Sequence, residues 1–400
     1  MRLQELLSRR RVAVAYLGLA LLAALAVACT DDSVTGVDEA QVPDLAAEEL
    51  RVWRGDGGVT VMTWNVYVGA DLEKILTATS PEQLIQYVTE AYYTLIATNF
   101  PERAEAIADQ IARFRPHLIG LQEISKIYTQ TPSDYVLGGD APATDEFMDY
   151  LKILQEALQS RGLDYRVAGE VRNFNVEMPM WTGNDPIPYD DVRLEDWEVV
   201  LVRGDVEVSR VLEKNFAVEV PEPPFGIPFP CGYVALDAEV GRKTYRFVSA
   251  HLQALWVAEL LPVQLGQALE LVTVLEDEKL PVIVVGDFNS PAPDGATYKF
   301  MLDNGYVDTW TGNLNPFEGE GLTNPHEWHL MNPDVNFTQR IDFIFARNDI
   351  PIGKQPAVGP VIATVVGDAQ DDRTSSGLWP SDHAGIVARL HFPRVKASRQ

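Results

Sequence analysis

The sequence is poor in cysteine. It has two among 400 residues, Cys29 and Cys231, and Cys29 directly follows an apolar N-terminal segment. The single thiol beyond that segment cannot form an intramolecular disulfide, so a hydrophobic core has to hold the fold together. The chain also lacks a cysteine cluster and an HExxH motif. These absences exclude the usual sequence patterns of zinc sites.

Basic residues are scarce as well. Lys and Arg total 32 against 58 Asp and Glu, which gives a formal net charge of −26 at pH 7. A chain this acidic repels polyanions unless metal ions or a local basic patch intervene. No run of Lys and Arg interleaved with aromatic residues is present. The composition therefore weighs against tight binding to nucleic acid.

The N-terminus has the pattern of an export signal. Arg2 and residues 9–11 form a positive region, residues 12–28 carry no charge, and small residues precede Cys29. The apolar run is at the short limit for spanning a bilayer, so a transmembrane anchor is the weaker alternative. The stretch resembles the lipobox of bacterial lipoproteins, which implies that Cys29 becomes lipid-modified. We therefore expect residues 1–28 to be a lipoprotein signal peptide, and the protein to be exported and anchored to a membrane of the cell envelope.

The residues after this signal read as a tether. Residues 29–57 are rich in small and acidic residues, and we expect them to link the lipidated Cys29 to a domain flexibly. Loss of residues 1–28 would change the net charge from −26 to −29, because they carry four Arg and one Glu. The folded domain is expected over residues 58–395.

Beyond the tether, apolar runs of strand length alternate with helical patterns. The expected strands are residues 58–65, 116–123, 197–203, 243–252, 280–289, 340–347 and 381–392. The expected helices are two within residues 81–114, with Pro81 and Pro101 at their starts, and one each within 145–161 and 257–278. This alternation predicts an α/β domain with helices on both sheet faces.

Polar residues stand at the ends of these strands. Those at the carboxyl ends are Asn65, Glu123, His251 and Asp287, and those near the amino ends are Asp342 and the pair Asp382–His383. If the last two strands run antiparallel to the others, all of these residues reach one rim, where α/β sheets gather ligands. Turn chemistry explains one polar strand end, but it does not explain a whole set of carboxylates, amides and imidazoles.

The residue types in this set favour hydrolysis assisted by a metal ion. Glu123, Asn65 and Asp382 would offer hard oxygen ligands, which suit Mg²⁺, Mn²⁺ or Ca²⁺. His383 could act as a base, with Asp342 holding its ring and stabilising the imidazolium.

Two further residues complete the pattern. His251 could give a proton to a leaving group or bond a phosphate, and Asn289 would supply an amide to the same phosphate. No Ser or Cys stands out as a nucleophile, so water is the expected attacker. A metal ion would neutralise the charge that develops on phosphoryl oxygens. The set as a whole predicts metal-assisted hydrolysis of a phosphate ester.

Six short motifs carry a resemblance to a known family. TWNV, LQE, SAHL, GDFNSP, RIDFIF and SDH, in this order, resemble the endonuclease/exonuclease/phosphatase superfamily across residues 58–395. The resemblance implies a four-layer α/β sandwich, in which two packed mixed β-sheets are flanked by helices. It also implies a metal-dependent phosphoester hydrolase.

The resemblance assigns roles by position. Asn65, Glu123 and Asp382 match metal-side residues, and Asp342 matches the aspartate that orients the catalytic histidine. His251 matches the histidine of deoxyribonuclease-like and sphingomyelinase-like members. With histidine at both positions, we favour His383 as base and His251 as acid. Asp287, in the GDFN motif with Asn289, would then position water or metal, and in the alternative Asp287 is itself the base.

Single residues of the set also have structural explanations. Asn65 could cap a strand end, and Asp342 could be the buried partner of Arg340 or Arg347. The completeness of the set makes such explanations weak. Of the other histidines, His326 and His329 could bind a metal together only if they lay on a helix. We expect instead that they belong to a loop that shapes the substrate entrance.

Two long segments exceed a minimal member of the family. Residues 66–110 look like an insertion near the site. Residues 124–196 contain Asp185, Asp190 and Asp191, for which we expect a solvated acidic loop rather than a second cation site.

Three substrate classes compete. A phospholipid or sphingomyelin comes first, because a lipid anchor would hold the site near a membrane and HLQA at 251–254 resembles the sphingomyelinase form of the histidine motif. The apolar stretch 223–234 could touch lipid, although a buried hairpin is the simpler explanation. Nucleic acid, cleaved by an extracytoplasmic endonuclease, comes second, and a small phosphate ester such as an inositol phosphate third. A non-catalytic binding protein on the same fold would not need the complete set.

Overall fold

A computed structural model describes residues 58–221, 228–315, 319–348 and 358–392. The expected signal peptide, Cys29 and the tether lie outside these residues, as do residues 223–227 of the apolar stretch 223–234. No helix among the described residues is long and apolar enough to cross a membrane.

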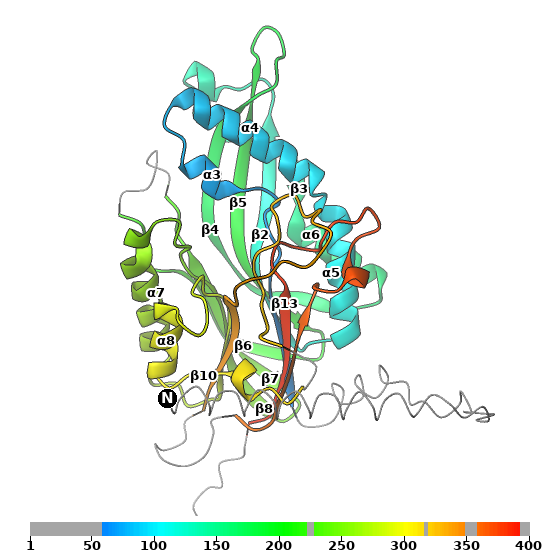
Figure 1. The fold of residues 1–400 in the computed structure, drawn as a ribbon, viewed down its shortest axis with the longest axis vertical. Coiled ribbons are helices and arrows are strands. Elements are labelled where there is room, and N and C mark those ends of the chain that lie inside the picture. The colour runs from blue at the N-terminus through cyan, green and yellow to red at the C-terminus, as the bar shows by residue number, and fades with distance from the viewer. Residues whose placement is uncertain (1–57, 222–227, 316–318, 349–357, 393–400) are drawn as a thin grey trace, which may run out of the picture. The chain divides into compact units, whose positions relative to one another are not determined.

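Seven strands form the first sheet (Figure 1). Their order is β12–β13–β1–β2–β5–β4, and β3 pairs with β2 outside this path. The strands are β1 (Val59–Asn65), β2 (Leu118–Gln130), β3 (Asp145–Asp149), β4 (Tyr165–Trp181), β5 (Tyr189–Arg203), β12 (Val361–Val366) and β13 (Gly385–Leu390). The sheet is mixed, because β1 runs parallel to β2 and antiparallel to β13.

Six strands form the second sheet. Their order is β10–β11–β9–β8–β7–β6. The strands are β6 (Glu207–Asn215), β7 (Gly232–Val240), β8 (Lys243–His251), β9 (Val282–Asp287), β10 (Val307–Asp308) and β11 (Asp342–Arg347). This sheet is mixed too, since β8 and β9 are parallel while β11 is antiparallel to β9.

The two sheets pack face to face through alternating apolar side chains. In β9, Ile283 and Val285 join the core between the sheets, whereas Val282 and Val284 face the helices on the other side. Successive side chains of a strand point to opposite faces, so a fully apolar strand contributes side chains to the cores on both faces of its sheet. The sheets approach closely at Gly120, where an added Cβ would lie 2.4 Å from Ser249 Oγ.

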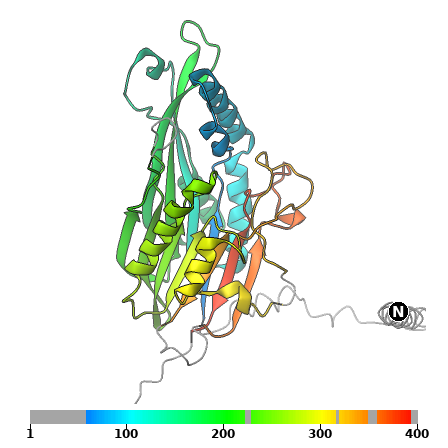
Figure 2. The same cartoon turned by 60° about the vertical axis from the view of Figure 1, so that its left-hand side comes forward.

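Helices cover the outer faces of both sheets (Figures 1 and 2). Helices α5 (Phe100–Phe114) and α6 (Tyr150–Ser160) pack on the first sheet, and α7 (Leu261–Val274) and α8 (Ala296–Asp303) on the second. Short 3₁₀ segments occur at Tyr135–Leu137, Ala258–Leu260, Thr309–Gly312 and Gln370–Asp372. The predicted four-layer α/β sandwich, two packed mixed sheets flanked by helices, is confirmed.

One end of the first sheet extends beyond the sandwich. Strands β2, β4 and β5 continue there, and α3 (Leu72–Leu76) and α4 (Pro81–Ala97) lie against them (Figure 1). Val88 of α4 packs with Met178 and Met180 of β4. The insertion expected at 66–110 therefore contributes α3, α4 and much of α5.

The prediction of an acidic loop within residues 124–196 was wrong. Residues 165–203 form a long β4–β5 hairpin, in which Asp190 and Asp191 lie on β5 and Asp185 is exposed at the turn. The Asp191 carboxylate is buried and accepts hydrogen bonds from Ser133 Oγ and two backbone amides. It stabilises the neighbouring turn.

Two element boundaries also differ from the prediction. The segment 145–161 begins with β3, and the helix starts only at Tyr150, after Asp149 caps it by accepting from Lys152 N. The segment 257–278 is likewise a 3₁₀ turn followed by α7. Local propensity predicted the helices, but pairing with β2 overrides it at 145–149.

Candidate active site

The strand directions bring the polar strand ends together. β1 and β2 are parallel in the first sheet, and β8 and β9 are parallel in the second. β11 runs antiparallel to β9, with Asp342 directly opposite Asp287, and β13 runs antiparallel to β1. Residues at the starts of β11 and β13 therefore reach the rim where the other strands end, as the sequence analysis required.

Glu123 reaches this rim in a way that the sequence did not indicate. β2 continues to Gln130 rather than ending at Glu123. Leu121 pairs with Val199 and Ile124 with Trp197, so β2 has one extra residue at this point. Such a bulge re-aims a side chain, and Glu123 has a positive φ of 59° there. This conformation is uncommon for Glu, and strain of this kind gathers at functional sites.

Asn65 bridges two carboxylates of the rim. Its Nδ2 donates to Glu123 Oε1 at 2.8 Å and to Asp287 Oδ2 at 3.2 Å. Its Oδ1 accepts from Tyr67 N at 3.0 Å, so the residue also shapes the turn after β1. Glu123 Oε2 in turn accepts from Val68 N at 2.8 Å. Asn65 therefore lies in the site, as expected. It also caps the end of β1, which was the structural alternative for this residue.

Asp287 ends β9 at a point where only glycine can precede it. Gly286 has a φ of 141°, and an added Cβ would lie 1.8 Å from Ala250 O of the neighbouring strand. Asp287 is buried, and its Oδ1 accepts from Asn289 N at 2.8 Å. Burial and the negative charge of Asp342 raise the pKa of Asp287 to about 6, although the two nearby histidines oppose the shift.

His383 and Asp342 form a buried pair. His383 Nδ1 lies 2.8 Å from Asp342 Oδ2, and Nε2 lies 2.8 Å from Asn324 Nδ2 and 3.8 Å from Asp287 Oδ2. Burial alone would lower the pKa of His383, but the charge and hydrogen bond of Asp342 outweigh it and raise that pKa well above its usual value. The ring is thus oriented from one side and presents Nε2 to the site.

The alternative partners proposed for Asp342 are engaged elsewhere. Arg340 Nη1 lies 2.8 Å from Asp308 Oδ2, and Arg347 donates to Leu275 O. Asp342 Oδ1 is buried and has no hydrogen-bond partner among the described residues. The His383 ring is therefore the principal partner of the Asp342 carboxylate.

His251 and Asn289 stand together on the other side of Asp287. His251 Nε2 lies 3.7 Å from Asp287 Oδ2 and 3.2 Å from Asn289 Nδ2. The same amide donates to Leu252 O at 2.9 Å, which fixes the Asn289 side chain, and Asn289 has a positive φ of 48°. Both histidines of the predicted acid–base pair therefore lie within 4 Å of one carboxylate oxygen.

Asp382 is the fourth carboxylate of the site. It precedes β13, and Ser381 Oγ, which donates to Asn65 O at 2.7 Å, lies beside it. Burial and the negative charge of Glu123 raise the pKa of Asp382 to about 7, although His383 and Arg103 act in the opposite direction. Burial is the larger cause of this shift, and the Glu123 carboxylate adds to it.

Arg103 is a residue of the site that sequence reasoning missed. Its fully buried guanidinium donates to Val66 O, Tyr67 O, Thr98 O and Pro380 O, at 2.6 to 3.0 Å. These bonds tie the turn after Asn65 to the segment before Asp382. One clue was available, because Arg103 falls on the apolar face of α5 with Phe100 and Ile107.

The two loop histidines do not form a metal site. His326 is buried, contacts Asn336 and Asn332 through Nδ1, and stacks on Trp379 with ring centroids 4.4 Å apart. His329 is partly exposed and pairs with Glu327. The segment is a loop as expected, and His326 is among the residues that line the cleft.

A cleft of about 740 Å³ contains these groups. Six of the eight predicted site residues line it, and the other two, Asn65 and Asp342, lie behind them. The carboxylates among the described lining residues are Asp71, Glu73, Glu123, Asp196, Asp287, Glu327 and Asp382, and no Lys or Arg is among them. An isolated anion would be repelled here, so the cleft needs a cation to hold a phosphate.

The residues fit a hard divalent cation. Glu123, Asp382 and Asn65 offer oxygen atoms, which such ions prefer. Burial and the Glu123 charge disfavour the ionised form of Asp382, and a bound cation would favour it. Ligand atoms of Asp287, Asp342 and His383 also lie within 4.8 Å of one another. In that second group, His383 and Asp342 are hydrogen-bonded to each other.

Comparison with known proteins agrees with this geometry. A sequence profile described as the Endonuclease/Exonuclease/phosphatase family matches residues 62–383. The solved structure of an endonuclease/exonuclease/phosphatase from Beutenbergia cavernae is 19% identical, with a TM-score of 0.52, over 84% of this chain and 72% of that one. At this identity the likeness supports the fold alone.

Two other solved structures are more distant. A family protein from Leptotrichia buccalis is 18% identical with a TM-score of 0.49, over 84% of this chain and all of that one. TDP2 from D. rerio, complexed with a single strand DNA product, is 14% identical with a TM-score of 0.46, over 84% and 100%. No curated protein matches the chain. Because the family profile spans most of its length, the chain belongs to the endonuclease/exonuclease/phosphatase family, whose members hydrolyse phosphoesters.

Proposed function

We propose that this protein is a metal-dependent phosphodiesterase for substrates of low charge, of the phospholipid or sphingomyelin type. One observation carries the proposal: a His–Asp pair and a set of oxygen ligands meet in a cleft whose described lining contains no Lys or Arg. The first half of that observation supports phosphoester hydrolysis, and the second half supports the choice of substrate.

The metal side of the cleft has a simple assignment. Glu123, Asn65 and Asp382 would hold Mg²⁺, or alternatively Mn²⁺ or Ca²⁺, which would neutralise charge on the phosphoryl oxygens. The Asn65 amide now donates to Glu123 and Asp287, so Asn65 also holds these carboxylates at a fixed spacing.

The histidines supply the proton transfers. In its neutral form, His383 would accept a proton from water at Nε2 as the water oxygen bonds to phosphorus, and Asp342, which raises the pKa of His383, would hold the ring from Nδ1 and stabilise its charged form. The bond between phosphorus and the leaving oxygen breaks at the same centre. His251 would give its proton to that oxygen. Asn289 donates one amide hydrogen to Leu252 O, and the other could be donated to a phosphoryl oxygen.

Asp287 lies between the two histidines and would position the attacking water. In the alternative mechanism Asp287 is the base. A carboxyl with a pKa of about 6 is ionised at neutral pH, which keeps that alternative chemically sound. Variants at position 383 separate the two mechanisms, because only one of them needs the imidazole as proton acceptor.

The charge of the cleft supports a phosphodiester that carries little negative charge. Seven carboxylates line it, and a polynucleotide would bring several phosphates to a surface without described cationic partners. A zwitterionic head group brings one phosphate and a cation of its own. Aromatic side chains at the entrance, Trp256 and Trp328, offer faces on which such a cation can rest.

The test compares three substrate classes with the same protein preparation. Purified protein is incubated with sphingomyelin liposomes, supercoiled plasmid and inositol polyphosphates, with Mg²⁺ or with chelator, beside His383→Ala. Metal-dependent release of phosphocholine by the native protein alone is the expected result. Plasmid nicking without phosphocholine release would replace the substrate proposal with an extracytoplasmic endonuclease.

Metal binding is tested without turnover. Mg²⁺ should raise the thermal midpoint of the native protein by several degrees, because a ligand that binds only the folded state stabilises it. Glu123→Ala should abolish that rise, whereas Glu207→Ala, at an exposed position of β6, should keep it. Absence of turnover and of the thermal rise together would favour a non-catalytic binding protein on this fold.

We also propose that the domain is exported and held at a membrane through lipidated Cys29. The charged start, the short apolar run and the small residues before Cys29 support this. Cells that express the full chain with labelled palmitate should yield labelled protein in the membrane fraction. Cys29→Ser should remove the label, and retention of the label would contradict the proposal.

A further inference from the structure

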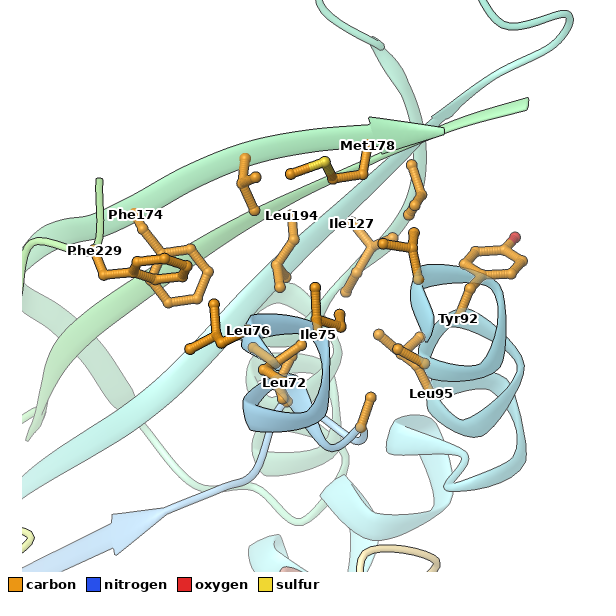
Figure 3. A pocket seen from close by; sticks show the side chains of 16 residues that line it. Leu72, Ile75, Leu76, Tyr92, Leu95, Ile127, Phe174, Met178, Leu194 and Phe229 are labelled. Atoms are coloured by element: carbon orange, nitrogen blue, oxygen red, sulfur yellow. The ribbon is translucent and has the colours of Figure 1, made fainter. Parts of the chain in front are cut away.

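A second cavity adjoins the catalytic cleft. It lies between α3 and α4 on one side and the extended parts of β2, β4 and β5 on the other (Figure 3). Sixteen residues line it, and apart from the Tyr92 hydroxyl their side chains are hydrocarbon or thioether. Six of them line the catalytic cleft as well: Val68, Ala70, Leu72, Leu76, Phe174 and Phe229. We name this cavity the apolar pocket.

An aromatic wall runs from the cleft into the apolar pocket. Trp256 lines the cleft near His251, and its ring centroid lies 6.2 Å from that of Phe229. Phe229 in turn packs edge-on against Phe174, 5.7 Å away. Figure 3 shows Phe174 and Phe229 together at one end of the apolar pocket, with Leu72 and Leu76 of α3 opposite them. The two cavities are therefore continuous along one apolar surface.

The residues that the structure describes leave space inside the apolar pocket. Its volume is about 80 Å³. Protein interiors normally close around voids larger than a water molecule, since every lining atom without a neighbour loses dispersion contacts. A polar ligand gains nothing here, because the walls offer almost no hydrogen-bonding groups. At about 10–15 Å³ for each water-sized group, there is room for roughly five to eight such groups.

We infer that the apolar pocket binds an aliphatic chain of the phosphoester substrate. The inference rests on the proposed function, since it takes the phosphate to lie in the cleft beside His251 and Asp287. A hydrocarbon chain joined to that phosphate would follow the aromatic wall between α3 and β4. The helices α3 and α4, which the long N-terminal insertion supplies, therefore act as a substrate-selecting cover.

A series of substrates of increasing chain length tests this directly. Alkyl 4-nitrophenyl phosphodiesters, from methyl to decyl, are hydrolysed with Mg²⁺ below the concentration at which they aggregate. We expect kcat/KM to rise about threefold to fourfold for each added methylene. The rise should end near the chain length that fills the apolar pocket.

Paired variants on one helix supply the control. Ala91 of α4 lines the apolar pocket, and Ala91→Phe would occupy it and flatten the dependence on chain length. Ala97→Phe makes the same change at an exposed position of the same helix, and it should keep both the dependence and the basal rate. Leu194→Ala instead enlarges the apolar pocket, and should move the end of the rise to longer chains. If Ala91→Phe fails to fold, Leu194→Ala still tests whether the apolar pocket sets the preferred chain length.

Binding measurements separate this inference from the proposed function. Alkylphosphocholines from butyl to decyl are titrated calorimetrically into the protein with Mg²⁺. Affinity that rises with chain length in the native protein, but not in Ala91→Phe, supports the apolar pocket even if no substrate is hydrolysed. Metal-dependent hydrolysis with rates and affinities independent of chain length would overturn the inference and leave the phosphodiesterase in place.

Discussion

Individual carboxylates in the site differ in what surrounds them. Asp342 is fully buried and faces one histidine, whereas Asp382 faces Glu123 and the open cleft. The first environment favours a fixed negative charge that orients a ring. The second favours a carboxylate that binds a cation, because its charge is compensated by no neighbouring Lys or Arg among the described lining residues. Aspartate thus serves two purposes in this site, ring orientation and cation binding. The burial of each carboxylate and its neighbours decide which purpose it serves.

Removal of the His383 ring should stop turnover. We expect His383→Ala and His383→Gln to lower kcat by about 10²–10⁴-fold, the usual contribution of an acid–base group. The Gln variant keeps an amide that can donate to Asp342, so its thermal midpoint should stay close to that of the native protein. His391→Ala, one residue beyond the far end of β13, is the matched control and should keep full activity. Native-like turnover in His383→Gln would favour Asp287 as base.

Metal affinity should depend on pH through Asp382. Its pKa of about 7 lies above the usual value, so the carboxyl is protonated below pH 7 in the metal-free protein. A proton there competes with the cation, and affinity for Mg²⁺ should be about tenfold weaker at pH 6 than at pH 8. Calorimetric titration at the two pH values measures the ratio. Asp382→Asn should flatten it, and an equal slope in that variant would assign the proton to another group.

At the scale of elements, α5 does more than cover a sheet. Arg103, from its buried face, holds backbone carbonyls on both sides of the metal ligands. Arg103→Met keeps the bulk of the side chain but leaves those carbonyls buried without donors. We expect a loss of about 3 kcal/mol or more in the free energy of unfolding.

The same variant should loosen the metal site. Mg²⁺ affinity should fall by roughly tenfold or more, as is usual when groups that support metal ligands are removed. Arg113→Met changes an exposed residue in the last turn of α5, and both its stability and its affinity should stay native. Denaturant unfolding and calorimetry measure the two effects. Loss of stability with unchanged affinity would show that Arg103 is structural only.

Much of this arrangement could be predicted from the elements alone. Apolar runs and helical spacing predicted the α/β sandwich, because each strand and helix must bury a face. The strand-end position of Asp287 followed from the apolar run of β9. The bulge at Glu123 could not be predicted, since it depends on how β2 pairs with β5, about 75 residues away in the chain. The role of Arg103 could not be predicted for the same reason, because its hydrogen-bond partners come from three separate segments.

At the scale of the whole molecule, charge should shape how substrates arrive. The chain carries a net charge of −26, and its cleft is lined by carboxylates. An anionic substrate is therefore repelled at low salt, and screening relieves the repulsion. We expect kcat/KM for anionic alkyl nitrophenyl phosphodiesters to rise by a factor of roughly two to ten between about 10 and 150 mM salt at constant Mg²⁺. Zwitterionic phosphocholine esters should show little change, and a fall with salt for the anionic esters would contradict this account.

The catalytic pair joins the two halves of the sandwich. His383 precedes a strand of the first sheet and Asp342 begins a strand of the second, yet their side chains meet at 2.8 Å. Neighbouring strands in a sheet are about 4.8 Å apart, so a slip of one sheet over the other by one strand would separate the pair entirely. Catalysis is thus possible only when the sheets are docked in a single alignment. Turnover therefore depends on the packing between the sheets. A substitution in the core between them should lower activity before it lowers any other measured property.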